Sequence, residues 1–560
     1  MCGILGGNVK TWNYDEGIKK ISHRGPDGSR INSLSEITLA FTRLAIMDLN
    51  DRAMQPMTSE DEKVWIVFNG EIYGFSKLKR ELQKEFSFNT TSDTEVILNA
   101  YLKYGDGFID KIDGMFAIAI VDFRTKELKL YRDRAGIKPL YYYYNGDKFA
   151  FASELKAITT TCTDVDFEID YTALYDYLFY GYIPTPKTFY KNCFKLPAGV
   201  RLIYSLQERK IIKKEKYWTL HVNTSVGRKK SKEDIEEAIR HLITKSVKEQ
   251  MVADVKVGTY LSGGIDSSIV SYECYRNDES IHAFSIGFED KKFDETMYAR
   301  EMASKYDIHF LNKTLSSNEI KNLKGLLKRC YDEPYADTSA YPTFLLSQMA
   351  KQDVTVVLTG DGGDELFGGY PSCVRLQEVS KGIKVDKICD LLYWKYFGKI
   401  DISSTFGEFY KSRCTVIDNK MKQLARLWKI DKDYDVLWYL KKYYIPDLPP
   451  MSRSKYLDFK TYMTDDVLTK VDRASMAVSL EARIPFLSRE LIEYAFSLSQ
   501  EECFSGGQLK GCLKDAYAEI IPSDILYRKK QGFCVPRGYT GTRHNEKEVI
   551  RILRDEWRMA

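Results

Sequence analysis

The chain has few histidines, little net charge and no paired cysteine motif. Only six histidines occur in 560 residues, and none lie at the spacing of metal ligands, so we do not expect a histidine-rich metal centre. The eleven cysteines are scattered without a Cys-x-x-Cys pair, which favours reduced thiols over a disulfide framework or a zinc site. A formal charge of +4 gives no reason to expect nucleic acid or an anionic membrane as a partner.

Long apolar runs are also missing. No stretch of about 18 apolar residues occurs, so no transmembrane helix is predicted, and residues 115–121 are typical of a short buried strand. No apolar leader precedes Cys2, so we expect no signal peptide and a cytoplasmic location. The length, with 44% apolar and 29% charged residues, indicates a globular protein. At roughly 100–200 residues per domain, two or three domains are expected.

The first candidate functional residue is Cys2, which directly follows Met1. A small second residue allows the initiator methionine to be removed, which would leave a thiol and a free α-amine on one residue. Since an α-amine has a pKa near ~8, it can accept a proton at neutral pH. Cys2 would then be an N-terminal nucleophile that carries its own base. The alternative is a small buried residue at the start of a strand.

The first part of the chain has the pattern of a mixed α/β domain. Short apolar runs between Gly, Asn and Asp predict strands at 64–68, 115–122 and 128–131, and helical periodicity appears at 74–84 and 93–104. Residues 222–232 are polar and resemble a linker. We therefore predict a first domain over residues 1–205, a linker over 206–232, a second domain over 233–536 and a tail over 537–560.

The second part alternates strands and helices. A helix is predicted at 233–252, followed by strands at 255–261, 282–288 and 354–358, a pattern typical of a parallel sheet covered by helices. From about residue 381 the sequence is mostly helical in character. The polar residues from 537 onward are expected to be loosely held.

A glycine-bearing loop follows the strand predicted at 255–261. Residues 262–268 read Ser-Gly-Gly-Ile-Asp-Ser-Ser and lead into a helix, so backbone amides, hydroxyls and the helix dipole can surround an anion. Asp266 is unusual in a phosphate loop unless a cation bridges it, and Mg²⁺ is the natural choice. No Gly-x-x-x-x-Gly-Lys-Ser/Thr pattern occurs, which excludes a Walker-type loop. The alternative is an ordinary strand-to-helix turn.

A second acidic turn follows the strand at 354–358. Asp361, Asp364 and Glu365 lie on a glycine-rich segment, and these carboxylates repel one another unless a cation or hydrogen-bond donors stabilise them. Since ligands bind at the strand ends of open parallel sheets, Asp364 could hold Mg²⁺ together with Asp266. A solvated acidic turn is the alternative.

Late in the chain, residues 528–530 are typical of a solvated basic surface.

Taken together, the motifs resemble those of the glutamine-dependent asparagine synthetases. The first set matches the family's N-terminal glutaminase domain: Cys2-Gly3-Ile4 and residues 23–27, 43–46, 69–73, 92–95 and 132–140. The second set, residues 262–268, 360–370 and 481–487, is similar to its synthetase domain. The resemblance extends from Cys2 to about Pro536. It implies an α/β and α+β fold, with an N-terminal-nucleophile αββα sandwich before a parallel-sheet ATP-pyrophosphatase domain that has a helical C-terminal part.

The resemblance also implies residue roles in the first domain. Cys2 would attack the glutamine amide with its own α-amine as base, and Asn69 and Gly70 would form the oxyanion hole. Arg43 would bind the α-carboxylate of glutamine, while Glu71 and Asp93 would bind its α-ammonium group. The glutamine-binding residues implied are Arg43, Leu44, Ala45, Ile46, Met47, Asn69, Gly70, Glu71 and Asp93.

In the second domain the resemblance implies a site for ATP and Mg²⁺. The ATP-binding residues implied are Leu261, Ser262, Gly263, Gly264, Asp266, Ser267, Ser268, Ile286, Thr359 and Gly360. Asp266 and Asp364 would bind the metal. Asp361 is linked to the acyl-adenylate step and Lys510 to charge stabilisation on the phosphates. Ammonia would reach this site through an internal tunnel. A homodimer is compatible with the family.

The sequence favours no single carboxylate as the acceptor of the ammonia. Some members of the family carry a Thr-Thr-x-Arg segment that helps bind aspartate, whereas residues 332–340 here contain no arginine. Asp361 also stands where many members carry glutamate. The base rate within the family favours aspartate as the acceptor. The missing arginine instead favours a uronic acid or another cell-surface carboxylate. A non-catalytic binding protein is disfavoured, because Cys2, Asn69, Asp93, Asp266 and Asp364 are all present.

Overall fold

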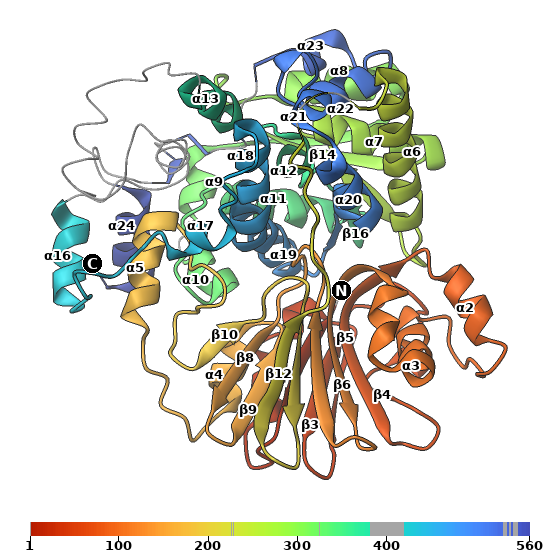
Figure 1. Cartoon of the computed structure of the whole chain (residues 1–560), viewed down its shortest axis with the longest axis vertical. Coiled ribbons are helices and arrows are strands. Elements are labelled where there is room, and N and C mark those ends of the chain that lie inside the picture. Colours follow the sequence, from red (N-terminus) through yellow and green to blue (C-terminus); the bar gives the residue numbers. More distant parts are fainter. Residues whose placement is uncertain are drawn as a thin grey trace.

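A computed structural model gives the fold in two halves (Figure 1). It describes residues 2–225, 227, 229–323, 325–380, 419–529, 532, 535–536, 539–540 and 547–559. The strand-rich first half occupies the lower part of Figure 1, and a helix-rich second half lies above it. The marker of the N-terminus lies where the two halves meet. Cys2 is therefore close to the junction.

Two six-stranded sheets form the first half, and every neighbouring pair of strands in them is antiparallel. The strand order of the first sheet is β10 (Cys193–Lys195), β8 (Tyr141–Asn145), β9 (Lys148–Ala152), β1 (Gly3–Gly7), β3 (Thr38–Arg43) and β2 (Gly28–Ser33). That of the second is β12 (Lys210–Lys216), β11 (Val200–Ser205), β7 (Glu127–Arg132), β6 (Asp113–Asp122), β5 (Val64–Tyr73) and β4 (Met57–Thr58).

The alternation of side chains along the strands produces a four-layer sandwich. Ile4 of β1 and Val67 of β5 share the core between the sheets, as expected for residues that point inward. Leu5, one residue on, packs outward against the helices α1 (Tyr14–Lys19) and α4 (Leu155–Thr161). Phe68 packs outward with α2 (Ser76–Leu82) and α3 (Asp93–Tyr104). The expected αββα architecture is confirmed.

The second sheet continues beyond residue 205. Residues 210–216 form β12 and pair with β11, although this stretch lies inside the expected linker. Its sequence, Lys-Ile-Ile-Lys-Lys-Glu-Lys, has the lysines typical of an edge strand, which protect the edge but give the segment a polar, linker-like composition. The strand therefore belongs to the sandwich.

The second half is built on a five-stranded parallel sheet. The strand order is β15 (His309–Leu315), β14 (His282–Phe288), β13 (Val257–Tyr260), β16 (Val356–Leu358) and β17 (Glu481–Arg483), with all pairs parallel. The chain places β14 and β15 on one side of β13 and later returns to place β16 and β17 on the other. A crevice at such a switch point, at the carboxyl ends of the strands, is where open α/β sheets bind ligands.

Helices cover both faces of this sheet. One face packs against α6 (Lys232–Gln250), α7 (Ile265–Asn277) and α8 (Thr296–Tyr306). The other packs against α11 (Ala340–Ala350) and α19 (Leu468–Met476). The other α-helices within the described residues are α5 (Tyr171–Tyr180), α9 (Ser317–Lys321), α10 (Leu326–Tyr331), α12 (Gly363–Phe367), α13 (Pro371–Ser380), α16 (Asn419–Leu427), α17 (Trp438–Tyr443), α18 (Pro450–Asp458), α20 (Arg489–Ser497), α21 (Gln500–Cys503), α22 (Gly511–Ala516), α23 (Ser523–Leu526) and α24 (Glu548–Ile552).

The C-terminal segment is packed rather than loose. The Tyr177 hydroxyl of α5 donates a hydrogen bond to the Val549 carbonyl over 3.0 Å, and Val549, Ile552 and Leu553 are buried. The expectation of a loosely held tail is thus wrong for α24 and the residues after it, because its apolar residues recur at helical spacing among the charges. Residues 381–418, expected to be helical, lie outside the described residues. Among the described helices, none is long and apolar enough to cross a membrane.

Buried ion pairs join the two halves. Arg24 of the sandwich contacts Glu154 at 2.9 Å and, across the junction, Asp472 of α19 at 2.8 Å. Arg473 reaches back from α19 to Glu154 at 2.9 Å. Removing one partner of such a buried pair typically costs about 3–5 kcal/mol, because the other charge is left buried and unpaired.

Candidate functional site

A narrow cavity lies beside Cys2 at the end of the sandwich. Its lining contains Cys2 and seven of the residues expected to bind glutamine: Arg43, Leu44, Ile46, Met47, Gly70, Glu71 and Asp93. Ala45 and Asn69, the other two, are not in the lining, and the Ala45 N–H donates to the Asp27 carboxylate at 2.8 Å. The cavity holds about 40 Å³.

Asn69 is the direct partner of Cys2. The main-chain nitrogen of Cys2 donates a hydrogen bond to Asn69 Oδ1 over 3.0 Å. Asn69 lies on β5 and is completely buried, and its Nδ2 has no hydrogen-bond partner among the described residues. A buried amide N–H₂ without an acceptor is costly, which is typical of a donor kept for a ligand.

The N–H group of Gly70 points into the same cavity. The neighbouring N–H groups of Phe68 and Ile72 turn away from β6 and donate to the side chains of Gln55 at 2.6 Å and Asp93 at 3.1 Å. Because alternate residues of a strand donate to the same side, the Gly70 N–H lies between them and faces the cavity. A Cβ atom at Gly70 would come within 2.0 Å of the Met115 carbonyl, so only glycine fits.

Two charged residues at this cavity have environments suited to recognise an amino acid. Arg43 is held by its N–H groups, which donate to the carbonyls of Asn50, at 2.8 Å, and Asp48. Asp93 is in the first turn of α3, and burial raises its pKa to about 6 despite the hydrogen bond from Ile72. The cavity therefore presents a guanidinium group and a carboxyl group to a ligand that carries charges of both signs.

The thiol of Cys2 depends on a nearby base. Burial raises the pKa of the Cys2 thiol, and its Sγ lies 3.9 Å from the Leu44 carbonyl. The thiol is therefore protonated at neutral pH. Its main-chain nitrogen, once the initiator methionine is removed, is an amine on the same residue that can accept the proton.

A larger cavity of about 670 Å³ lies at the switch point of the parallel sheet. Residues that follow β13 and β16 line it, as the strand-end rule predicts. The sequence-predicted residues in its lining are Leu261, Ser262, Gly264, Asp266, Ser267, Ile286, Thr359, Gly360, Asp361, Asp364 and Lys510. Gly263 and Ser268 are outside the lining.

The loop between β13 and α7 is shaped by close contacts. Gly263 has φ +79°, and a Cβ atom there would lie 2.7 Å from the Ala299 nitrogen. Ser267 Oγ accepts a hydrogen bond from the Ser262 N–H at 3.1 Å, which ties the loop to the first turn of α7. A Cβ atom at Gly360 would lie 2.6 Å from the Ser267 nitrogen, so the β16 loop also needs glycine to approach. The two loops thus form one floor of the cavity.

Lys510 brings the two predicted metal ligands together. Its Nζ contacts Asp266 Oδ2 and lies 2.6 Å from Asp364 Oδ1. Burial alone would lower the pKa of Lys510, but the two carboxylates hold it above its usual value. Carboxylate oxygens that converge on one ammonium group are also close enough to share a divalent cation, so these residues fit Mg²⁺. Among the described residues, no group of three or more His, Cys, Asp or Glu side chains could hold a metal.

Arg528 is part of the cavity wall and not a solvated surface residue. It pairs with Glu295, and its Nη2 donates to the Gly263 carbonyl at 3.2 Å. The expectation of a solvated basic surface is wrong for this residue, because a carboxylate distant in sequence holds it against the loop. Lys530 lies outside the described residues.

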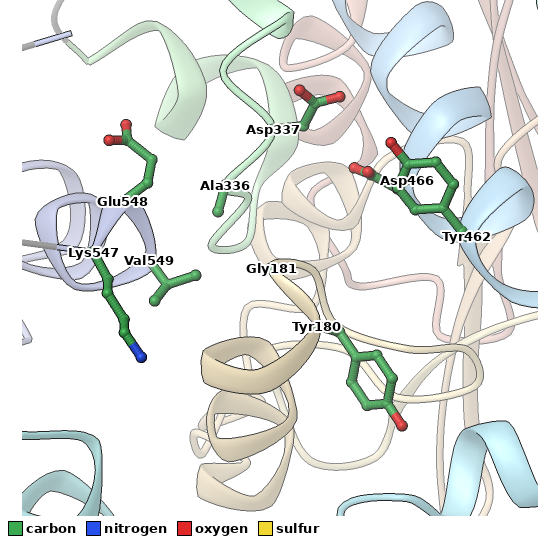
Figure 2. Close-up of a pocket in the computed structure, with 9 residues that line it drawn as sticks. All are labelled: Tyr180, Gly181, Ala336, Asp337, Tyr462, Asp466, Lys547, Glu548 and Val549. Atoms are coloured by element: carbon green, nitrogen blue, oxygen red, sulfur yellow. The ribbon is translucent and has the colours of Figure 1, made fainter. Parts of the chain in front are cut away.

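A side pocket of about 260 Å³ adjoins the large cavity, since Asp337 and Tyr462 line both. Figure 2 shows Asp337 and Asp466 on one side of it and Lys547 and Glu548 on the other. Lys547 is directed to the Met421 sulfur, at 3.8 Å, and Glu548 pairs with Arg551. Burial and the Asp337 carboxylate raise the pKa of Asp466 to about 8. The pocket therefore offers carboxyl groups beside the cavity.

Two residues of these sites gave weak sequence signals. Asp466 lies in a helical stretch without a recognisable motif. Arg483 is part of the segment 481–487 that carried the family resemblance, but its position beside the Cys2 cavity was not foreseen. Its Nη2 lies 3.1 Å from Glu71 Oε2.

Comparison with known proteins gives two family matches. The asparagine synthase family model matches residues 238–560, and the glutamine amidotransferase domain model matches residues 1–218. The chain is 33% identical to asparagine synthetase [glutamine-hydrolyzing] 1 of Bacillus subtilis, over 96% of this chain and 87% of that protein. It is 35% identical to a putative asparagine synthetase 2 of Methanocaldococcus jannaschii, over 87% of this chain and 100% of that protein.

Proposed function

The chain belongs to the asparagine synthase family, and from this we propose that it is a glutamine-hydrolysing asparagine synthetase. The observation that carries the proposal is the buried Asn69 Nδ2, which has no partner among the described residues, beside Cys2 and Gly70. A nucleophile next to an unused donor is the arrangement required for acyl transfer through an oxyanion.

In the first half, the Cys2 thiol would attack the side-chain amide of glutamine. The α-amine of Cys2 takes the thiol proton, and Asn69 and Gly70 stabilise the oxyanion. Collapse of this intermediate transfers a proton to the departing nitrogen and releases ammonia, which leaves a thioester on Cys2. Water then hydrolyses the thioester to glutamate. Arg43 binds the α-carboxylate, and Asp93 and Glu71 bind the α-ammonium group.

In the second half, ATP would bind in the large cavity with its phosphates on the 262–268 loop. Asp266 and Asp364 would hold Mg²⁺, which when bound neutralises phosphate charge. The acceptor carboxylate attacks the α-phosphate and pyrophosphate leaves, with Lys510 placed to stabilise its charge. Ammonia then attacks the acyl-adenylate, loses a proton and displaces AMP. Asp361 lines the same cavity, which supports a role for it in the acyl-adenylate step.

The side pocket favours aspartate over a uronic acid as acceptor. Asp337 and Asp466 lie next to the cavity in which the acceptor carboxylate must react. An amino acid carries an ammonium group that these carboxyl groups can bind, whereas a uronic acid has no cation.

The test is product analysis with purified full-length protein. Incubation with ATP, Mg²⁺, glutamine and aspartate should yield asparagine, glutamate, AMP and pyrophosphate in equal amounts. Glucuronate and galacturonate replace aspartate in parallel reactions. Glutamine hydrolysis without asparagine, together with AMP formation only from a uronic acid, would reject aspartate as the acceptor. A cytoplasmic location and a homodimer stay predictions.

A further inference from the structure

Arg483 is a fully buried arginine of β17 whose Nε and Nη1 donate hydrogen bonds and whose Nη2 forms an ion pair. Its Nε donates to Glu481 Oε1 at 2.7 Å, and its Nη1 donates to the carbonyls of Gln250 and Val252, each at 2.7 Å. Its Nη2 lies 3.1 Å from Glu71 Oε2. Three of these contacts are within the second half, so the guanidinium is fixed there before it reaches the first half.

The main chain of Arg483 is fixed as well. Its carbonyl accepts a hydrogen bond from the Thr359 N–H at 2.9 Å, and it pairs in parallel register with Leu358 of β16. Thr359 lines the large cavity, and Glu71 lines the Cys2 cavity. Arg483 therefore stands between the two cavities and contacts one residue of each.

Glu71 needs a positive partner. Burial and the nearby Asp93 carboxylate raise the pKa of Glu71 well above its usual value, and Arg483 is the main positive group that opposes this rise. Without a cation, two adjacent buried carboxyl groups cannot both be charged. A carboxyl group that has to bind the ammonium group of glutamine must be ionised in the complex.

We propose that Arg483 is a positioning residue of the glutaminase site, supplied by the synthetase half, which pairs with the Glu71 carboxylate and aims it at the ammonium group of glutamine. The first half alone lacks this cation. The inference rests on the glutaminase part of the proposed function. It goes beyond that part because it makes glutamine recognition dependent on a strand of the ATP-binding sheet.

The test compares Arg483→Gln, Glu71→Gln and the double variant. Glutaminase kinetics give KM for glutamine, and synthesis from ammonium chloride shows that each variant is folded. A lost hydrogen bond to a charged group corresponds to about tenfold to a hundredfold, so KM should rise by this factor in either single variant with a smaller change in kcat. The double variant should show no further rise, because Arg483 acts through Glu71.

A matched control is Arg473→Gln, which removes another buried arginine at the junction that pairs with Glu154 and lies outside the lining of either cavity. It should lower thermal stability similarly but leave KM for glutamine unchanged. If Arg483→Gln does not fold, Arg483→Lys is compared with Arg473→Lys instead. KM for glutamine should then rise in Arg483→Lys, by a smaller factor, and stay unchanged in Arg473→Lys.

A pH profile separates positioning from general destabilisation. KM for glutamine is measured as a function of pH. In Arg483→Gln the low-pH limb of this profile should shift to higher pH, whereas Arg473→Gln should keep the wild-type profile. Unchanged KM in the Arg483 variants, or KM effects that multiply in the double variant, would overturn the role of Arg483. An absence of wild-type glutaminase activity would instead reject the proposed function.

Discussion

The main-chain nitrogen of Cys2 donates to Oδ1 of Asn69 over 3.0 Å, while Nδ2 of the same side chain keeps its donors free of partners among the described residues. One amide therefore serves two tasks. Its oxygen orients the amine that accepts the thiol proton, and its nitrogen is left to stabilise an oxyanion. Asn69 can do both only because β5 places it on the inter-sheet side, together with Val67.

Replacing Cys2 separates the two half-reactions. We expect Cys2→Ala to abolish glutamine hydrolysis and glutamine-dependent synthesis, because the thiol is the nucleophile, and to retain synthesis from ammonium chloride. Cys193→Ala, a buried cysteine of β10 outside the cavity, is the control and should keep both activities. Release of glutamate by Cys2→Ala at the wild-type rate would assign the nucleophile to another residue.

Replacing Asn69 tests the double role of its amide. Asn69→Ala removes one oxyanion donor, which typically lowers kcat by ~10²–10³. It also removes the acceptor for the Cys2 nitrogen, so we expect a loss at the upper end of this range. Asn69→Asp restores an acceptor but supplies no N–H₂ donor, and should recover little. Stopped assays of glutamate release measure this, and recovery of full activity by Asn69→Asp would contradict the oxyanion role.

Glutamine recognition should depend on pH through Asp93. Its folded-state pKa of about 6 means that the carboxylate is mostly charged at pH 7 and mostly neutral at pH 5. Because the charged form binds the ammonium group, kcat/KM for glutamine should fall about tenfold from pH 7 to pH 5. Asp93→Asn should have low kcat/KM throughout and lose this limb of the profile. The same acid limb in Asp93→Asn would assign the titration to another group.

The phosphate site can be tested through Asp266. Asp266→Asn removes one of the two carboxylates that converge on Lys510 and would hold Mg²⁺. We expect pyrophosphate release to fall about a hundredfold or more with either nitrogen source, since charge stabilisation of this kind is worth several kcal/mol. Glutaminase activity without ATP should persist. Asp278→Asn, at the exposed far end of the same helix, is the matched control. Equal rates in both variants would remove Asp266 from the phosphate site.

Much of the fold follows from local patterns. The helix over residues 93–104 and the strand over 282–288 match α3 and β14 residue for residue, because their apolar periodicity is strong. The loop at 262–268 could be predicted to bind phosphate, because glycines, hydroxyls and a carboxylate seldom occur together between a strand and a helix for another purpose. The edge strand β12 was not, because lysines that protect an edge make a strand look like a linker.

The parts of the sites that escaped prediction depend on contacts between distant segments. Glu71 and Arg483 are far apart in the chain, and only the packing of β17 beside the sandwich brings them together. Arg528 was expected in solvent for the same reason, since its partner Glu295 lies before α8. Asp466 carries a chemical signal only after burial places it near Asp337.

Asp466 gives the sharpest test of the acceptor. Its pKa of about 8 keeps it mostly protonated at pH 7, so binding of an ammonium group there must release a proton. KM for aspartate should therefore fall about tenfold between pH 7 and pH 9, as the carboxylate becomes charged before the ligand arrives. Asp466→Asn should raise KM for aspartate at pH 9 and remove the dependence, while KM for glutamine stays as in the wild type. A uronic acid has no ammonium group, so its KM would show no such fall and would not rise in Asp466→Asn. The measurement is the initial rate of AMP formation at saturating ATP, with the concentration of each acceptor varied at several pH values from 7 to 9. If Asp466→Asn leaves KM for aspartate unchanged, the ammonium group binds elsewhere.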